Sequence, residues 1–141
     1  MRSFEKLLQE IGSIINIPMH AEEGRICLLE INHNLRIQIE DDLVKQKIVV
    51  VCFIAEIAAG KFRENILKEA LKANFFSSRI GNFAYLEKNN SLSFYTYVEN
   101  TISAEEISLV LERCITVGNN WYEAIRNSQI PNITQESTQF F

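Results

Sequence analysis

The chain has 141 residues, 47% of them hydrophobic, which is enough to bury one core without disulfides. Its net charge of −4 argues against broad nucleic-acid binding and against docking on anionic lipid, because both need a basic face. The three cysteines, Cys27, Cys52 and Cys114, are odd in number and widely spaced, which favours free, buried thiols in a reducing cytoplasm.

The first predicted element is an amphipathic helix near the N-terminus. Large apolar side chains recur there at helical spacing: Phe4, Leu7, Leu8, Ile11, Ile14 and Ile15. Ser3 is a plausible N-cap, and Pro18 prevents the helix from continuing. The stripe is wider than contact with one sheet needs, so part of it is free for a partner.

Three strands are predicted to follow this helix. Residues 25–31 are apolar and partly alternating, residues 35–40 alternate strictly, and residues 47–54 are rich in β-branched side chains. The sequence Asn-His-Asn at 32–34 predicts a short hairpin turn, and the polar residues 41–46 predict a second turn.

The second half of the chain predicts a helix, two strands and a long final helix. The second helix follows Gly60 and ends near Asn74, and strands over 81–87 and 92–99 form a hairpin. The final helix is the best specified, since residues 103–106 have the spacing of a capping box.

This order of elements predicts the fold class and the extent of the domain. Helix, three strands, helix, two strands, helix implies an α+β domain with an antiparallel sheet of about five strands and its helices on one face. We expect the domain to span residues 1–127. Residues 128–141 have no periodicity and are predicted to form a flexible C-terminal tail.

Patterns typical of catalysis or metal binding do not appear in the sequence. His20 and His33 fall in predicted loops, and neither has a cysteine or carboxylate at metal-ligand spacing. The glycines never form a phosphate-binding loop, and no nucleophile has an identifiable base nearby. We therefore expect a binding protein with no catalytic residues, no metal and no cofactor.

The chain also carries more apolar surface than one sheet face needs. The strand over residues 92–98 has Phe94 on one face and Tyr95 and Tyr97 on the other. The face that the helices leave free must meet another molecule or remain in water. The alternative, that these aromatic residues only complete the core, is equally open for any one of them.

Several of these segments resemble the class I type III secretion chaperones. Residues 65–74, Asn-Ile-Leu-Lys-Glu-Ala-Leu-Lys-Ala-Asn, are similar to the Leu-Leu-x-x-Asn segment that closes the second helix in that family. The hairpin over residues 81–97 and the opening amphipathic helix are also typical. The final helix carries the expected spaced aliphatic residues followed by a tryptophan: Ile107, Val110, Leu111, Val117 and Trp121.

The resemblance implies a chaperone that binds an extended stretch near the N-terminus of a secreted effector and keeps it unfolded and soluble. It further implies a dimer, either of two identical chains or with a related chaperone, and no nucleotide. For effector binding we expect the residues Phe4, Leu8, Ile11, Ile15, Ile26 and Leu28. For the dimer interface we expect the residues Phe62, Ile66, Ala70, Phe94, Tyr95 and Tyr97.

Other functions remain compatible with the sequence. The chain could be a regulator that binds folded proteins, for example in transcription or in the order of secretion, or an α+β module with a small-ligand pocket. Each predicted binding residue also has an alternative role in the chain's own core. Burial in the folded chain and the identity of the partner distinguish these possibilities.

Overall fold

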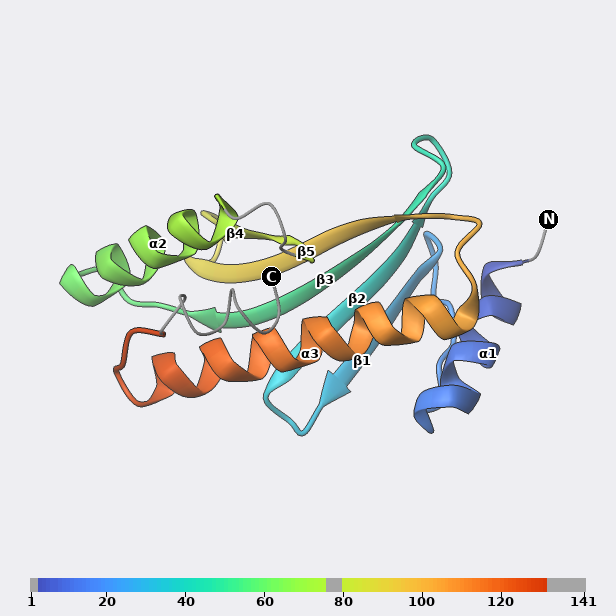
Figure 1. The fold of residues 1–141 in the computed structure, drawn as a ribbon, viewed down its shortest axis with the longest axis horizontal. Coiled ribbons are helices and arrows are strands. Elements are labelled where there is room, and N and C mark those ends of the chain that lie inside the picture. Colours follow the sequence, from blue (N-terminus) through green and yellow to red (C-terminus); the bar gives the residue numbers. More distant parts are fainter. Residues whose placement is uncertain (1–2, 76–79, 132–141) are drawn as a thin grey trace.

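Eight helices and strands follow one another in this computed structural model, which describes residues 3–75 and 80–131 (Figure 1). Their bounds are α1 (Phe4–Ile15), β1 (Ile26–Ile31), β2 (Leu35–Asp42), β3 (Lys47–Glu56), α2 (Lys61–Asn74), β4 (Asn82–Leu86), β5 (Ser91–Glu99) and α3 (Ala104–Arg126). The predicted order and the α+β fold class are therefore confirmed.

Local sequence signals explain where several elements begin and end. The hydroxyl groups of Ser3 and Ser103 each accept a hydrogen bond of 3.1 Å from the backbone N–H three residues further on, and so cap α1 and α3. Asn16 ends α1 by taking a left-handed conformation with φ of 61°, shortly before Pro18. The predicted hairpin turn at 32–34 is also present.

The five strands form one antiparallel sheet in the spatial order β1-β2-β3-β5-β4. β1 and β4 are therefore its two edges. Directly opposite residues form rows across the sheet, and one row runs through Leu28, Gln38, Val51 and Tyr95. Because alternate residues of a strand point to opposite faces, these four side chains share one face, which we call the outer face.

The helices pack on the other face, and the hydrophobic core lies between them and the sheet. α3 contacts β2, β3 and β5, α1 packs against α3, and α2 lies beside β4 (Figure 1). Trp121 of α3 is fully buried, with its ring centroid 4.3 Å from that of Phe83 on β4. Gly118 allows close approach of α3, because a Cβ there would lie only 2.5 Å from Cys52 Sγ on β3.

The last described helix, α3, ends next to residue 127, where the sequence predicts the end of the domain, and that boundary stays a prediction. The helix ends at Arg126, and the N–H of Asn127 donates to the Glu123 carbonyl at 3.1 Å. Ile130 is 40% exposed and Pro131 is buried. The rest of the predicted tail lies outside the described residues, so its flexibility stays a prediction.

Candidate functional site

The edge strand β1 hydrogen-bonds to β2 on one side, and no other described strand pairs with it on the other. The Arg25 carbonyl accepts a hydrogen bond of 3.0 Å from the Asp41 N–H. In an antiparallel pair the direction of the backbone groups alternates, so every second residue after Arg25 also points them at β2. The N–H and C=O groups of Leu28 and Glu30 therefore point away from the sheet.

The unpaired part of β1 is short. At its start, the Ile26 carbonyl already accepts a hydrogen bond of 2.7 Å from the Glu22 N–H, and at its end the chain turns at residues 32–34. Among the described residues, the backbone groups of Leu28 and Glu30 have no such partner. We call these two residues the open edge, and a segment added here would form main-chain hydrogen bonds with them.

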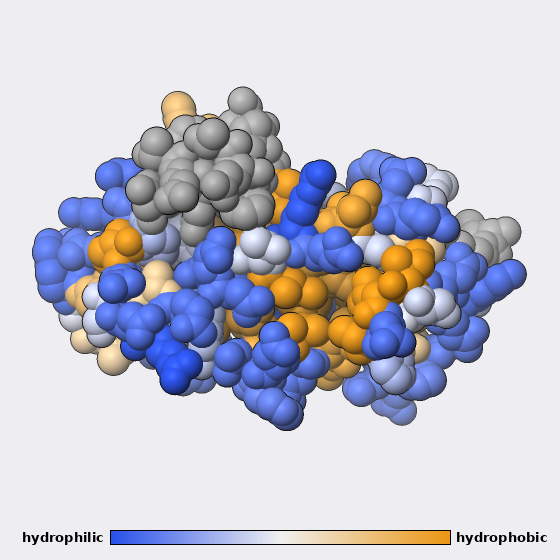
Figure 2. Space-filling view, turned by 60° about the horizontal axis from the view of Figure 1, so that its bottom comes forward, coloured by the Kyte–Doolittle hydropathy of each residue, from blue (hydrophilic) through white to orange (hydrophobic). Residues whose placement is uncertain are grey.

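Apolar side chains lie on both sides of the open edge. On the outer face Leu28 is 54% exposed and Ile26 is half-buried, and on the helix side Leu29 is buried in the core at 8% exposure. Figure 2 turns the lower side of Figure 1, which holds β1 and its hairpin, toward the viewer and shows a broad apolar area in its middle. A segment added at the open edge could place its own side chains against the outer face or against the helix side of the sheet.

A hollow of about 450 Å³ opens on the outer face beside the open edge. It is lined by Leu28, Leu29, Glu30, Arg36, Gln38, Phe53 and Asn89. The Arg36 guanidinium lies 5.7 Å from the centroid of the Phe53 ring, which is cation–π distance. The hollow therefore combines an aliphatic wall, an aromatic ring and groups of both charges.

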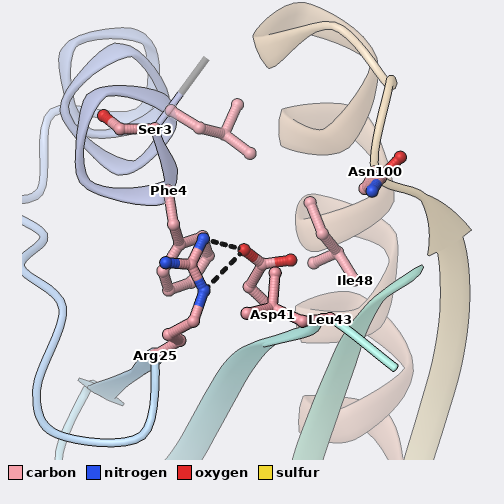
Figure 3. A pocket seen from close by; sticks show the side chains of 8 residues that line it. Ser3, Phe4, Arg25, Asp41, Leu43, Ile48 and Asn100 are labelled. Carbon is pink, nitrogen blue, oxygen red and sulfur yellow. Dashed lines mark hydrogen bonds and ion pairs between the residues drawn. The ribbon is translucent and has the colours of Figure 1, made fainter. Parts of the chain in front are cut away.

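A partly exposed ion pair fixes the start of β1 (Figure 3). Arg25 Nε donates to Asp41 Oδ2 at 2.9 Å, and Arg25 Nη2 contacts the same oxygen. The Asp41 side chain is only 10% exposed, and the Arg25 guanidinium also lies 5.8 Å from the Phe4 ring centroid. This pair joins the end of β2, the start of β1 and the start of α1, and so holds the open edge in place.

At the opposite edge of the sheet, a side chain of α2 pairs with the backbone of one β4 residue. Asn74, the last residue of α2, accepts a hydrogen bond from the Phe83 N–H at 2.7 Å and donates to the Phe83 carbonyl at 3.0 Å. The amide of Asn74 therefore pairs with Phe83 as a neighbouring strand would. Of the two edges, β1 is the one that offers consecutive outward-pointing residues without a partner in the described chain.

The structure separates the residues predicted for effector binding into two groups. Phe4, Leu8 and Ile11 of α1 are 4%, 0% and 0% exposed, and they form part of the core. Ile15 and Ile26 are half-buried, and Leu28 is exposed. Of the three accessible residues, Ile26 and Leu28 lie together on β1, and Ile15 lies on α1. Effector contact by these six residues stays a prediction, and the burial of Phe4, Leu8 and Ile11 places them in the chain's own core.

The residues predicted for the dimer interface also lie in different places. The structure buries Ile66, Ala70 and Phe94 in the chain's own core, leaves Phe62 and Tyr95 half-buried, and exposes 45% of Tyr97. α2 packs on the core face, whereas Tyr95 and Tyr97 point to the outer face. The α2 residues and the two tyrosines therefore lie on opposite sides of the sheet, and one flat interface cannot contact both.

Two strongly exposed residues of the α2 region were not among those predicted for the interface. Leu71 is 70% exposed and Phe75 is 89% exposed. They lie at the end of α2 near an apolar hollow of about 110 Å³, lined by Leu67, Ala70, Leu71, Asn74, Phe83, Ala84, Tyr85 and Leu92. Leu71 fits the helical periodicity of α2, and only the packing of the helix shows that it points outward.

The titratable groups give no sign of a catalytic or metal centre in the part of the chain that the structure describes. No three His, Cys, Asp or Glu side chains there are grouped to hold a metal ion. Burial raises the pKa of Cys52 and of Cys114 to about 12, and it also raises the pKa of Cys27. Protonated thiols are poor nucleophiles, so these three cysteines act as buried apolar residues.

The same described ranges, 3–75 and 80–131, contain no helix that is long and apolar enough to cross a membrane.

Three solved structures share this fold. A chain of the HopA1–SchA chaperone–effector complex is 13% identical with a TM-score of 0.69, covering 86% of this chain and 94% of that chain. A chain of the ExsC–ExsE complex is 13% identical with a TM-score of 0.65, covering 84% and 90%. A chain of the Yersinia pestis type III secretion chaperone SycH in complex with a fragment of YscM2 is 14% identical with a TM-score of 0.64, covering 82% and 97%.

The sequence itself identifies the family. Residues 6–121 match the Tir chaperone protein (CesT) family, and this range includes all five strands and most of the three helices. The chain therefore belongs to the Tir chaperone protein (CesT) family, and the resemblance to type III secretion chaperones noted in its sequence is confirmed. No curated protein matches the sequence.

Proposed function

We propose that this chain is a type III secretion chaperone that binds an extended segment of a secreted effector and keeps it soluble and competent for secretion. The open edge of β1 carries the proposal, and membership of the CesT family supports it. Holding a segment needs no catalytic group and no cofactor. Three buried, unpaired cysteines suit a protein of the reducing cytoplasm.

The segment adds to the sheet as a further strand beside β1. The backbone groups of Leu28 and Glu30 supply the hydrogen bonds, which do not depend on the sequence of the segment. Alternate side chains of the segment then contact the outer face around Leu28 or the apolar surface on the helix side. The backbone thus provides general affinity, and the side chains provide selectivity.

Two exposed leucines allow a matched test of this binding mode. Leu28 on β1 and Leu109 on α3 are both 54% exposed, so neither substitution to aspartate disturbs the core. We expect Leu28→Asp to weaken binding of an effector segment at least about tenfold, because a charge replaces an apolar contact beside the open edge. We expect Leu109→Asp to bind as the wild type does.

The measurement is co-expression of the full chain with N-terminal segments of type III effectors, followed by size exclusion and titration of the purified segment. Circular dichroism checks that both variants remain folded. Equal binding by Leu28→Asp and wild type, or a loss confined to Leu109→Asp, would place the effector site away from β1.

We also propose that two copies, or this chain and a related chaperone, associate through the α2 side. Leu71 and Phe75 offer exposed apolar surface next to the hollow beside β4. Tyr97 is already engaged within the chain, since Lys45 Nζ lies 3.3 Å from its hydroxyl and 4.9 Å from its ring centroid. The α2 side therefore exposes more apolar surface without a contact in the described chain than the outer face does at Tyr97.

A further inference from the structure

The open edge presents two side chains of different chemistry to the segment it binds. Leu28 and Glu30 are alternate residues of β1, so both point to the outer face, and both line the hollow there. A residue placed directly opposite one of them in an added strand has its Cβ about 5 Å away. Each position of the edge can therefore select the side chain opposite it.

Glu30 is an acidic group without a strong partner. Its side chain is 62% exposed, and the one ion pair that the described residues give it is with His33, at 3.5 Å. His33 is 96% exposed and is charged only when protonated. Arg36 is directly opposite Glu30 on β2, but no ion pair joins the two within the described chain, and the Arg36 guanidinium lies over the Phe53 ring.

The position of Leu28 has the opposite character. Leu28 is 54% exposed, and its neighbours across the row are Gln38 and Val51, neither of which is charged. A charged residue opposite Leu28 would lose water without gaining a partner, whereas an apolar residue would bury surface on both sides. Opposite Glu30, a basic residue gains charge complementarity and an acidic residue is repelled.

We propose that the β1 edge selects segments with an apolar residue opposite Leu28 and a lysine or arginine opposite Glu30, two positions away. This inference rests on the proposed function and names the chemistry of the segment that the edge accepts. Glu30 is thus a specificity-determining residue, and the open backbone groups supply the affinity that all extended segments share.

The test uses a library of short displayed peptides with randomised sequence, selected separately on the full-length wild type, Glu30→Lys and Glu112→Lys. Glu112 is an exposed glutamate of α3, so its reversal makes the same change of net charge away from β1. We expect wild type and Glu112→Lys to enrich peptides with an apolar residue and a basic residue two positions apart. We expect Glu30→Lys to enrich an acidic residue in place of the basic one.

The enriched peptide then gives a quantitative check by titration. Exposed charge pairs across strands contribute up to about 1 kcal/mol, so Glu30→Lys should raise its Kd by about fivefold. Exchanging the basic residue of the peptide for glutamate should restore binding to Glu30→Lys, and raised salt should shrink both effects.

Three outcomes separate the possibilities. Enrichment of peptides with no charge preference, or the same preference in wild type and Glu30→Lys, would overturn the role of Glu30 while leaving the proposed function intact. A shift of preference in Glu112→Lys equal to that in Glu30→Lys would also overturn it, because net charge would then be the cause. Failure of all three proteins to enrich any peptide would overturn strand addition at β1 and the inference with it.

Discussion

The side-chain amide of Asn74 makes two hydrogen bonds to the backbone of one residue, Phe83. The amide has a donor and an acceptor side by side, as a peptide group does, so it matches the exposed edge of β4. Neither aspartate nor leucine could make both bonds. The resemblance of residues 65–74 to the chaperone family singled out this asparagine, and the structure shows what it does.

Asn74→Ala should lower the free energy of unfolding by about 1–3 kcal/mol, because both backbone groups of Phe83 lose their partner in a partly buried site. Asn65→Ala is the matched control, since Asn65 is a half-buried asparagine of the same helix. Urea unfolding of the three proteins measures the difference. Equal stability of Asn74→Ala and Asn65→Ala would show that the bonds to Phe83 add nothing.

At the scale of elements, α1 is a supporting helix whose apolar stripe mostly faces inward. Leu8 and Ile11 are fully buried, whereas Ile14 is 46% exposed at its margin. The helix packs against α3, and the Arg25–Asp41 pair lies against its first turn. We therefore expect α1 to affect binding chiefly by supporting the start of β1.

Leu8→Ala should destabilise the chain by about 2–5 kcal/mol, because truncating a fully buried leucine leaves a cavity in the core. Ile14→Ala, in the same helix, should change stability by less than about 0.5 kcal/mol. Thermal unfolding followed by circular dichroism measures both. If Leu8→Ala were as stable as Ile14→Ala, α1 would not be anchored as the structure shows, and Leu8 would be free to contact an effector.

The two edge strands differ in how easily another chain can pair with them. β4 ends next to α2, and the α2 side chain of Asn74 pairs with it, whereas the described residues place one short turn, at Glu22, beside β1. Unprotected edges invite pairing with other chains. The short unpaired stretch at Leu28 and Glu30 limits such pairing to a small window, which suits a protein that must hold one segment and release it.

At the scale of the whole molecule, the apolar surfaces at β1 and at α2 lie on different sides of the fold (Figure 1). An assembly through α2 would leave β1 of each copy open to an effector. Two identical copies related by a two-fold axis would present the same patch to each other and close the assembly.

Leu71→Asp should therefore convert a dimer into a monomer. The substitution places a charge on an exposed part of the proposed interface without touching the core, since Leu71 is 70% exposed. Light scattering coupled to size exclusion should give about twice the chain mass for wild type and for Leu109→Asp, and the single mass for Leu71→Asp. A dimer that persists in Leu71→Asp but is lost in Tyr97→Asp would place the interface on the outer face.

The order and type of all eight elements could be predicted from the sequence. Its decisive signals are local: the serine caps at Ser3 and Ser103, the turn at residues 32–34, and the alternation in residues 35–40 all act within a few residues. The resemblance of individual segments to secretion chaperones also needed no structure, because it depends on residue types along the chain.

Which of these elements offers a binding surface follows from the packing of the complete fold and could not be read from the sequence. Whether β1 is an edge depends on the strand order β1-β2-β3-β5-β4, which pairs strands far apart in the chain. Phe4 is buried, with Arg25 from the segment before β1 over its ring, and Ile14 is exposed although both belong to the same stripe. Burial is set by contacts between distant segments, and periodicity along one helix does not contain that information.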